Sequence, residues 1–222
     1  MNAVDASLLG RPLSLVLVLG LVGLLPFLFM ALTSFVKIAT VLQIVRGAIG
    51  AESVPSSTVV LALSAALTLI ATAPVGSRVA ERLEPLLVHA SSDSSALITG
   101  AIDAVREPLR SFLGNNASAK EKARFLKLAR NKRAPGTEVS DTDLMVVVPA
   151  FLVTELLEAF TLGFAIYLPF LVIDLVVANV LIGLGMQMMN PSQISLPFKL
   201  LLFVAADGWG LLAEALVTGY VT

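Results

Sequence analysis

Charged residues in apolar surroundings are the first side chains of this 222-residue chain that could do chemistry. Glu155 and Glu158 lie three residues apart, so a helix would place both on one face. Asp174, Lys199 and Asp207 follow in equally apolar sequence. A charge at the centre of a bilayer costs about 2.5–3.5 kcal/mol, whereas a Leu, Val or Phe gains only about 0.3–0.6 kcal/mol. We therefore interpret these five residues as assembly contacts between subunits, with pairing or snorkelling within one subunit as the alternative.

Three methionines crowd the end of a predicted helix. Met186, Met188 and Met189 follow Gly185 and precede Pro191. Methionine is unbranched and adapts its shape to changing neighbours. A ring of such side chains could close on itself and still yield to varied peptides, as the gasket of a pore must. On composition alone, packing against lipid or in a core is the commoner role.

The inventory of reactive residues argues against an enzyme. The chain has no cysteine, which excludes a disulfide, a thiolate metal site and a cysteine nucleophile. His89 is the only histidine, and neither a nucleophile-elbow motif nor a Gly-rich phosphate loop accompanies it. The net charge of -1 disfavours a nucleic-acid binder. We predict no catalytic residue, no metal, no cofactor and no nucleic-acid partner.

The distribution of charge divides the chain into three sections. Hydrophobic residues make up 57% and charged residues 14%, which disfavours both a soluble monomer and a disordered chain. Residues 78–144 hold 20 of the 31 charged residues, and the uncharged runs 12–36 and 53–77 are long enough to span a bilayer. We predict an apolar helical hairpin over 1–77, a polar helical section over 78–144, and an apolar helical region with the methionine turn over 145–222.

The helical periodicity and the prolines of the sequence define the expected elements. No segment shows the pattern of a β-strand. The predicted fold is all-α, with kinked helical hairpins and a helical polar insertion. We expect a kink near Pro26, a helix end at Pro74 and a break or kink at Pro169. Lys37 and Arg46 favour a cytoplasmic first connection, which would put the polar section in the periplasm and the methionine turn on the cytoplasmic side. The expected helices cover residues 12–35 with a continuation to 46, 56–73, 96–113, 119–133, 141–167, 170–189 and 197–217.

A basic run lies inside the polar section. Between Lys120 and Arg133 there are seven Lys or Arg residues and one acid, Glu121. Most such runs are solvated helix faces, and contact with anionic lipid is the alternative.

Several long motifs have the pattern of one family. In the C-terminal half they are Pro149-Ala150-Phe151, Thr154-Glu155-Leu156, the run Leu168 to Asp174, Met186-Gln187-Met188-Met189-Asn190-Pro191, and Ile194 to Phe203 with Asp207-Gly208-Trp209. Pro26-Phe27, Thr33-Ser34-Phe35 and Lys37-Ile38 agree in the N-terminal half. By these motifs the chain resembles the R-type export-gate subunits called FliP in flagella and SctR in injectisomes. Its short length, the lack of an evident cleavable signal and Thr161 resemble the injectisome form more than the flagellar form.

The resemblance implies a function that composition cannot give. Family members form a homopentameric helical ring with S-type and T-type subunits, as the core of a type III secretion export gate. This gate lies in the bacterial inner membrane, in contact with lipid and partly on the periplasmic side, and unfolded secreted proteins pass through it. The methionine loop of the family lines the narrowest point, so Met186, Met188 and Met189 would form the pore gasket. The alternatives are a polytopic secondary transporter that uses its intramembrane carboxylates, and an intramembrane hydrolase that would need His89.

Overall fold

The computed structural model describes residues 16, 19–20, 22–50, 55–88, 94–132 and 139–221. His89 lies outside these residues. Every regular element within them is a helix, which confirms the predicted all-α fold. A helical segment Val22–Leu32 is followed by α2 (Phe35–Ile49), α3 (Ser57–Val88), α4 (Ser94–Asn116), α5 (Ala119–Lys132), α6 (Leu144–Gly183), α7 (Pro191–Ala205) and α8 (Gly208–Thr218).

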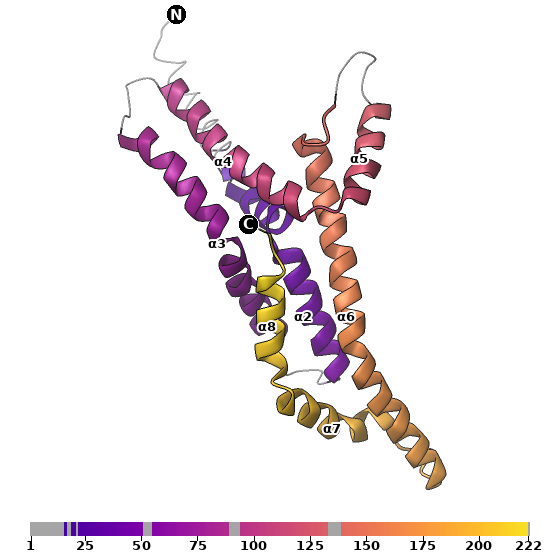
Figure 1. Ribbon diagram of the computed structural model, residues 1–222. Coiled ribbons are helices and arrows are strands. Elements are labelled where there is room, and N and C mark those ends of the chain that lie inside the picture. Colours follow the sequence, from indigo (N-terminus) through magenta and orange to yellow (C-terminus); the bar gives the residue numbers. More distant parts are fainter. Residues whose placement is uncertain are drawn as a thin grey trace, which may run out of the picture.

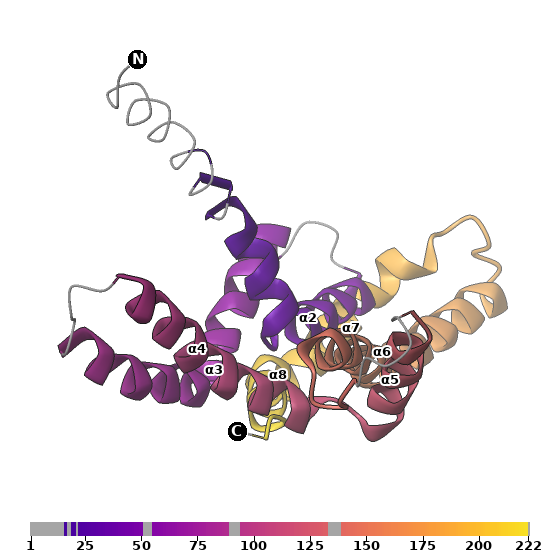
Figure 2. The same cartoon turned by 90° about the horizontal axis from the view of Figure 1, so that it is seen from above.

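The helices form two arms that diverge from a common centre (Figure 1). α3 and α4 pack together in one arm, and α5 packs beside the first part of α6 in the other. α2 lies between α6 and α8, and α7 crosses from the far end of α6 back to α8. Seen from above, the two arms spread outward on different sides of the central helices (Figure 2). The α6–α7 connection, with its methionines, therefore lies at the end opposite to α5.

The centre of the fold is α2, because apolar residues cover most of its circumference. Ile38, Val41 and Val45 are fully buried and belong to one core with Phe151 of α6. Burial of each such side chain contributes about 1.5–3 kcal/mol to stability. Gly163 of α6 allows the close approach, since a Cβ atom there would lie 2.5 Å from Cδ1 of Ile44.

Replacement of Gly163 by Val is expected to lower the free energy of unfolding by about 1–3 kcal/mol, the usual cost of overpacking. The new methyl groups would meet Ile44 across the contact between α2 and α6. Thermal unfolding in detergent measures the effect. Gly76→Val in α3 is the matched control, because nothing lies within 4 Å of a Cβ atom at Gly76. Equal melting temperatures for the two variants would contradict this account of the contact.

The helix end predicted at Pro74 was wrong, and of the break or kink predicted at Pro169 the break does not occur. α3 continues through Pro74 to Val88, and α6 passes Pro169 without a break. A proline removes one helical hydrogen bond, whereas ending the helix would leave several backbone groups without partners. In an apolar segment that second penalty is larger, because no water replaces the lost bonds. The helices predicted at 56–73, 141–167 and 170–189 are therefore parts of two long helices.

The two sharp bends lie at hydroxyl and acidic residues, whose side chains compete with the helix for backbone hydrogen bonds. Val22–Leu32 and α2 meet at 72°, beyond Pro26, where the Thr33 hydroxyl donates to the Phe29 carbonyl at 2.5 Å. The helix predicted over 197–217 is divided between α7 and α8 by a bend of 58°. Asp207 adopts a left-handed conformation there, with φ of 50°. A Cβ atom on Gly208 would lie 2.3 Å from the Phe203 ring, so glycine is needed beside it.

Two of the described helices are long and apolar enough to cross a membrane, Ser57–Pro85 and Leu144–Gly183, and up to four spans result if each bent pair counts as one. In the most apolar part of the second helix only 11% of the residues are buried inside the chain. These features are typical of a membrane protein. α3 continues across the predicted boundary between residues 77 and 78, so the apolar and polar sections share one helix.

Candidate functional site

The methionine turn, residues 184–190, joins α6 to α7 at the far end of their hairpin (Figure 1). Gly185 has a φ of +73°, which a glycine adopts without strain and which reverses the chain after α6. The side chain of Asn190 caps α7 by accepting a hydrogen bond from the Ser192 amide at 3.0 Å. Met188 is fully exposed, and Met186 and Met189 are 41% and 40% exposed. The hairpin therefore presents three adaptable apolar side chains on a short turn with a defined conformation.

A polar cluster connects the two helices that carry the turn. The Lys199 ammonium of α7 lies 2.7 Å from one carboxylate oxygen of Asp174 in α6. The other oxygen of Asp174 accepts a hydrogen bond of 2.5 Å from Ser195, which is fully buried. Lys199 also donates to the Ala48 carbonyl of α2 at 3.2 Å. One lysine thus ties the methionine hairpin to the central helix.

Burial makes this ion pair sensitive to the loss of either partner. The Lys199 side chain is 5% exposed and that of Asp174 is 25% exposed. Removal of one member of a buried pair leaves an uncompensated charge, which is far more costly than loss of a surface pair. The structure places Asp174 and Lys199 together within one chain, the arrangement that the sequence left as the alternative. A contact of either residue with a neighbouring copy remains a prediction.

A second polar cluster joins α2, α6 and the end of the chain. Lys37 of α2 lies 2.6 Å from Glu158 of α6 and 4.6 Å from the centre of the Tyr220 ring. The Tyr220 hydroxyl donates to the carboxylate of Glu155, which is 1% exposed. Burial raises the pKa of the Tyr220 phenol, and the neighbouring Glu155 raises it further, so Tyr220 stays the donor. Glu155 and Glu158 therefore both have partners in their own chain, and Glu158 remains about half exposed.

Two further residues, Asn116 and Tyr220, contribute to this region and were not predicted from the sequence. Asn116 donates to the Val221 carbonyl at 2.8 Å and accepts from the Val221 amide at 3.0 Å, which holds the chain end against α4. Tyr220 lies 186 and 65 residues from the two residues whose oxygens its hydroxyl contacts, Ser34 and Glu155. No local pattern carries information about such distant pairs. Only the presence of a polar residue in a largely apolar sequence could have drawn attention to either position.

Asp207 occupies a different environment from the other predicted charges. It lies at the bend before α8, is exposed, and its carboxylate covers Gly210, where a Cβ atom would meet Oδ2 at 2.4 Å. The bend separates it from the helix of Lys199. Its predicted assembly role stays a prediction. Within the described part of the chain, no group of three or more His, Cys, Asp or Glu residues is placed to hold a metal ion.

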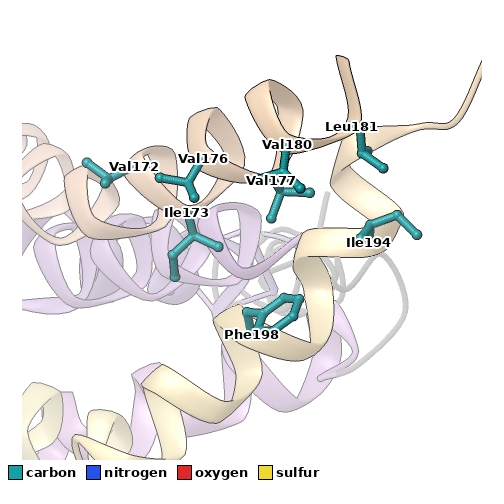
Figure 3. Close-up of a pocket in the computed structure, with 8 residues that line it drawn as sticks. All are labelled: Val172, Ile173, Val176, Val177, Val180, Leu181, Ile194 and Phe198. Atoms are coloured by element: carbon teal, nitrogen blue, oxygen red, sulfur yellow. The ribbon is translucent and has the colours of Figure 1, made fainter. Parts of the chain in front are cut away.

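Two apolar cavities flank α7. One of 460 Å³ lies between α6 and α7, and Figure 3 shows Val172, Val176 and Val180 of α6 on one side and Ile194 and Phe198 of α7 on the other. The second, of 470 Å³, is lined by residues of α6, α7 and α8. Both are lined by residues of α6 and α7, the two helices that the methionine turn joins.

A sequence model described as the FliP family matches residues 18–216. The chain belongs to the FliP family. This FliP-family chain is 39% identical to the hypersensitivity response secretion protein HrcR of Ralstonia nicotianae, over 93% of the chain and 96% of that protein. It is also 39% identical to Yop proteins translocation protein R of Yersinia pestis, over 94% of the chain and 96% of that protein. The flagellar biosynthetic protein FliP of Caulobacter vibrioides is 39% identical over 97% of the chain and 79% of that protein.

These relatives confirm the resemblance that the motifs predicted. The FliP-family match covers the helices from Val22–Leu32 to most of α8, and with them the methionine turn and both polar clusters. The chain spans nearly the whole length of the two secretion relatives and about four fifths of the flagellar one. In length it agrees with the relatives named for secretion and translocation.

Proposed function

We propose that this FliP-family chain is a pore-forming core subunit of a type III secretion export apparatus, through which unfolded proteins cross the bacterial inner membrane. The observation that carries the proposal is the methionine turn. Its side chains are exposed, while the helices on either side are held by a buried ion pair. The FliP-family model matches residues 18–216, and relatives named for secretion and translocation are 39% identical over most of the chain.

In the proposed assembly, five copies form a ring together with S-type and T-type subunits. The support is the apolar surface of α6, of which little is buried inside one chain. Asp174 and Glu158 are partly exposed and would meet neighbouring copies or partner subunits in addition to their own lysines. Glu155, Lys199 and Asp207 would contribute indirectly, by fixing the shapes of the surfaces that meet.

The proposed mechanism is passive gating without covalent chemistry. The methionines of several copies close on one another and exclude ions, since thioether side chains fill irregular gaps. When a substrate chain enters, the same side chains change rotamer and pack around it. The energy for movement comes from other components of the apparatus.

We also propose an orientation for the chain. The methionine turn lies at the same end as the start of α3, and α5 lies at the opposite end (Figure 1). The polar section, residues 78–144, would then face the periplasm and the methionine turn the cytoplasmic side.

The mass of the complex after mild detergent extraction tests the proposed ring. We expect a particle of several times the 23.3 kDa mass of the chain, because α6 exposes too much apolar surface for a stable single copy. A stable monomer under conditions that preserve the fold would contradict the ring and would favour the polytopic transporter. Helix content from circular dichroism is the control for folding in the same detergent.

A further inference from the structure

The methionine turn contains a β-turn in which three of the four side chains are thioethers. The Met189 amide donates to the Met186 carbonyl at 3.2 Å, which closes the turn Met186-Gln187-Met188-Met189. The first and fourth Cα atoms of a β-turn lie less than about 7 Å apart, so Met186 and Met189 are close neighbours. Met188 precedes Met189 and is fully exposed. The chain thus gathers three sulfur atoms within four residues.

The backbone of this turn is fixed on both sides. The Met186 amide donates to the Leu181 carbonyl at 2.9 Å, which ties the start of the turn to the last part of α6. Directly after the turn, Asn190 caps α7 by accepting from the Ser192 amide. Methionine side chains are unbranched and have three rotatable bonds. The sulfur atoms can therefore converge on one point without any movement of the two helices.

The ligand chemistry of the turn is soft and uncharged. Residues 184–190 contain no charged residue, and the nearest charges along the chain, Asp174 and Lys199, pair with each other. Hard cations such as Ca²⁺ and Mg²⁺ take oxygen ligands, mainly carboxylates, and the turn has no carboxylate to offer. Thioether sulfur is a soft ligand that suits Cu(I). The turn therefore discriminates by ligand softness and against divalent hard ions.

We propose that Met186, Met188 and Met189 bind a soft monovalent cation, Cu(I) or its analogue Ag(I). The ion is held by the sulfur atoms of one chain, so the proposal goes beyond the pore and does not depend on the ring. The prediction that the chain binds no metal rested on histidine and cysteine ligands, which this turn does not use.

Few other soft ligands in the chain compete for such an ion. The chain has no cysteine, and His89 is its only histidine. Met30 lies in the segment Val22–Leu32 and Met145 at the start of α6, each as a single thioether. Among the described residues, no other segment of four gathers three sulfur atoms. A tightly bound soft cation can therefore be assigned to the turn.

Calorimetric titration of the full chain with silver nitrate, in dodecyl maltoside and a chloride-free buffer, tests the site. We expect about one silver ion to bind per chain, because three thioethers form one soft site. Binding should persist between about pH 5 and 8, since a thioether takes up no proton in the range where a histidine titrates. The triple variant Met186→Leu, Met188→Leu and Met189→Leu keeps nearly the same apolar volume and should lose the binding.

Two control variants locate the ion. Met145→Leu removes an exposed thioether outside the turn and should bind silver like the unaltered chain. His89→Gln should do the same. Equal silver binding by the triple Leu variant and the unaltered chain would overturn the proposal, and so would loss of binding in His89→Gln.

A measurement on the unaltered chain makes the test independent of how any variant folds. With isotope-labelled methionine methyl groups, silver should shift the NMR signals of Met186, Met188 and Met189 and leave that of Met145 in place. Shifts confined to methionines outside the turn would overturn the proposal. The triple Leu variant also separates this site from the gasket, because it should retain most of the seal and yet bind no silver.

Discussion

Replacement of Met186, Met188 and Met189 by Ala is expected to make the closed pore leak ions while the complex still assembles. Each substitution removes most of a flexible side chain from the turn, and the loss is repeated in every copy of the ring. Because these side chains are 40% or more exposed in one chain, the free energy of unfolding should change by only about 0.5 kcal/mol for each. The expected defect is therefore one of sealing and not of folding.

Conductance of the purified complex in planar bilayers measures the seal, and detergent-extracted mass measures assembly. Met145→Ala is the matched control, because Met145 is also exposed, at 61%, but lies at the start of α6, far from the turn. A triple replacement by Leu keeps nearly the same volume and should retain most of the seal. Unchanged conductance of the triple Ala variant in an intact complex would rule out the gasket.

Loss of the Lys199 charge is expected to have the largest effect on stability. Lys199→Met leaves the partly buried Asp174 without its partner and removes the donor to the Ala48 carbonyl. Breaking a buried pair in this way typically lowers the free energy of unfolding by about 3–5 kcal/mol, and the partial exposure of Asp174 favours the lower end. Export should fail as well, since the same lysine holds the methionine hairpin against α2.

The double variant Asp174→Asn with Lys199→Met distinguishes the effect of an unpaired carboxylate from the effect of the changed side-chain shape at position 199. It removes both charges but keeps an oxygen that can accept from Ser195, so its stability should exceed that of Lys199→Met alone. The exposed pair of Glu107 and Arg110, at 3.6 Å, is the control, and Glu107→Gln should change stability by less than about 1 kcal/mol. If Lys199→Met melts like Glu107→Gln, the Lys199 pair does not hold the hairpin. Thermal unfolding in detergent gives all four values.

The local sequence pattern predicted the bounds of some helices correctly and those of others wrongly. The basic helix predicted over 119–133 is α5, Ala119–Lys132, because its charges and breaks are all encoded within the segment. Pro74 does not end its helix and Pro169 does not break its helix, because the surroundings of a proline decide whether the helix continues. The bend at Thr33 and Ser34 was missed, since hydroxyl side chains that compete with the helix leave no signal in hydrophobic periodicity.

The sequence by itself determined the all-helical class, the family and the three methionines at the end of a hairpin, because these depend on composition, periodicity and contiguous motifs. Only the tertiary structure decided the partners of the buried charges. Lys37 meets Glu158 across 121 residues of sequence, and Tyr220 meets Glu155 across 65. Such pairs form where packed helices bring distant positions within hydrogen-bond distance, and the sequence pattern of one helix carries no record of the neighbour it will face. The same packing turns isolated charges, each unfavourable in an apolar helix, into contacts that hold α2, α6 and α7 together.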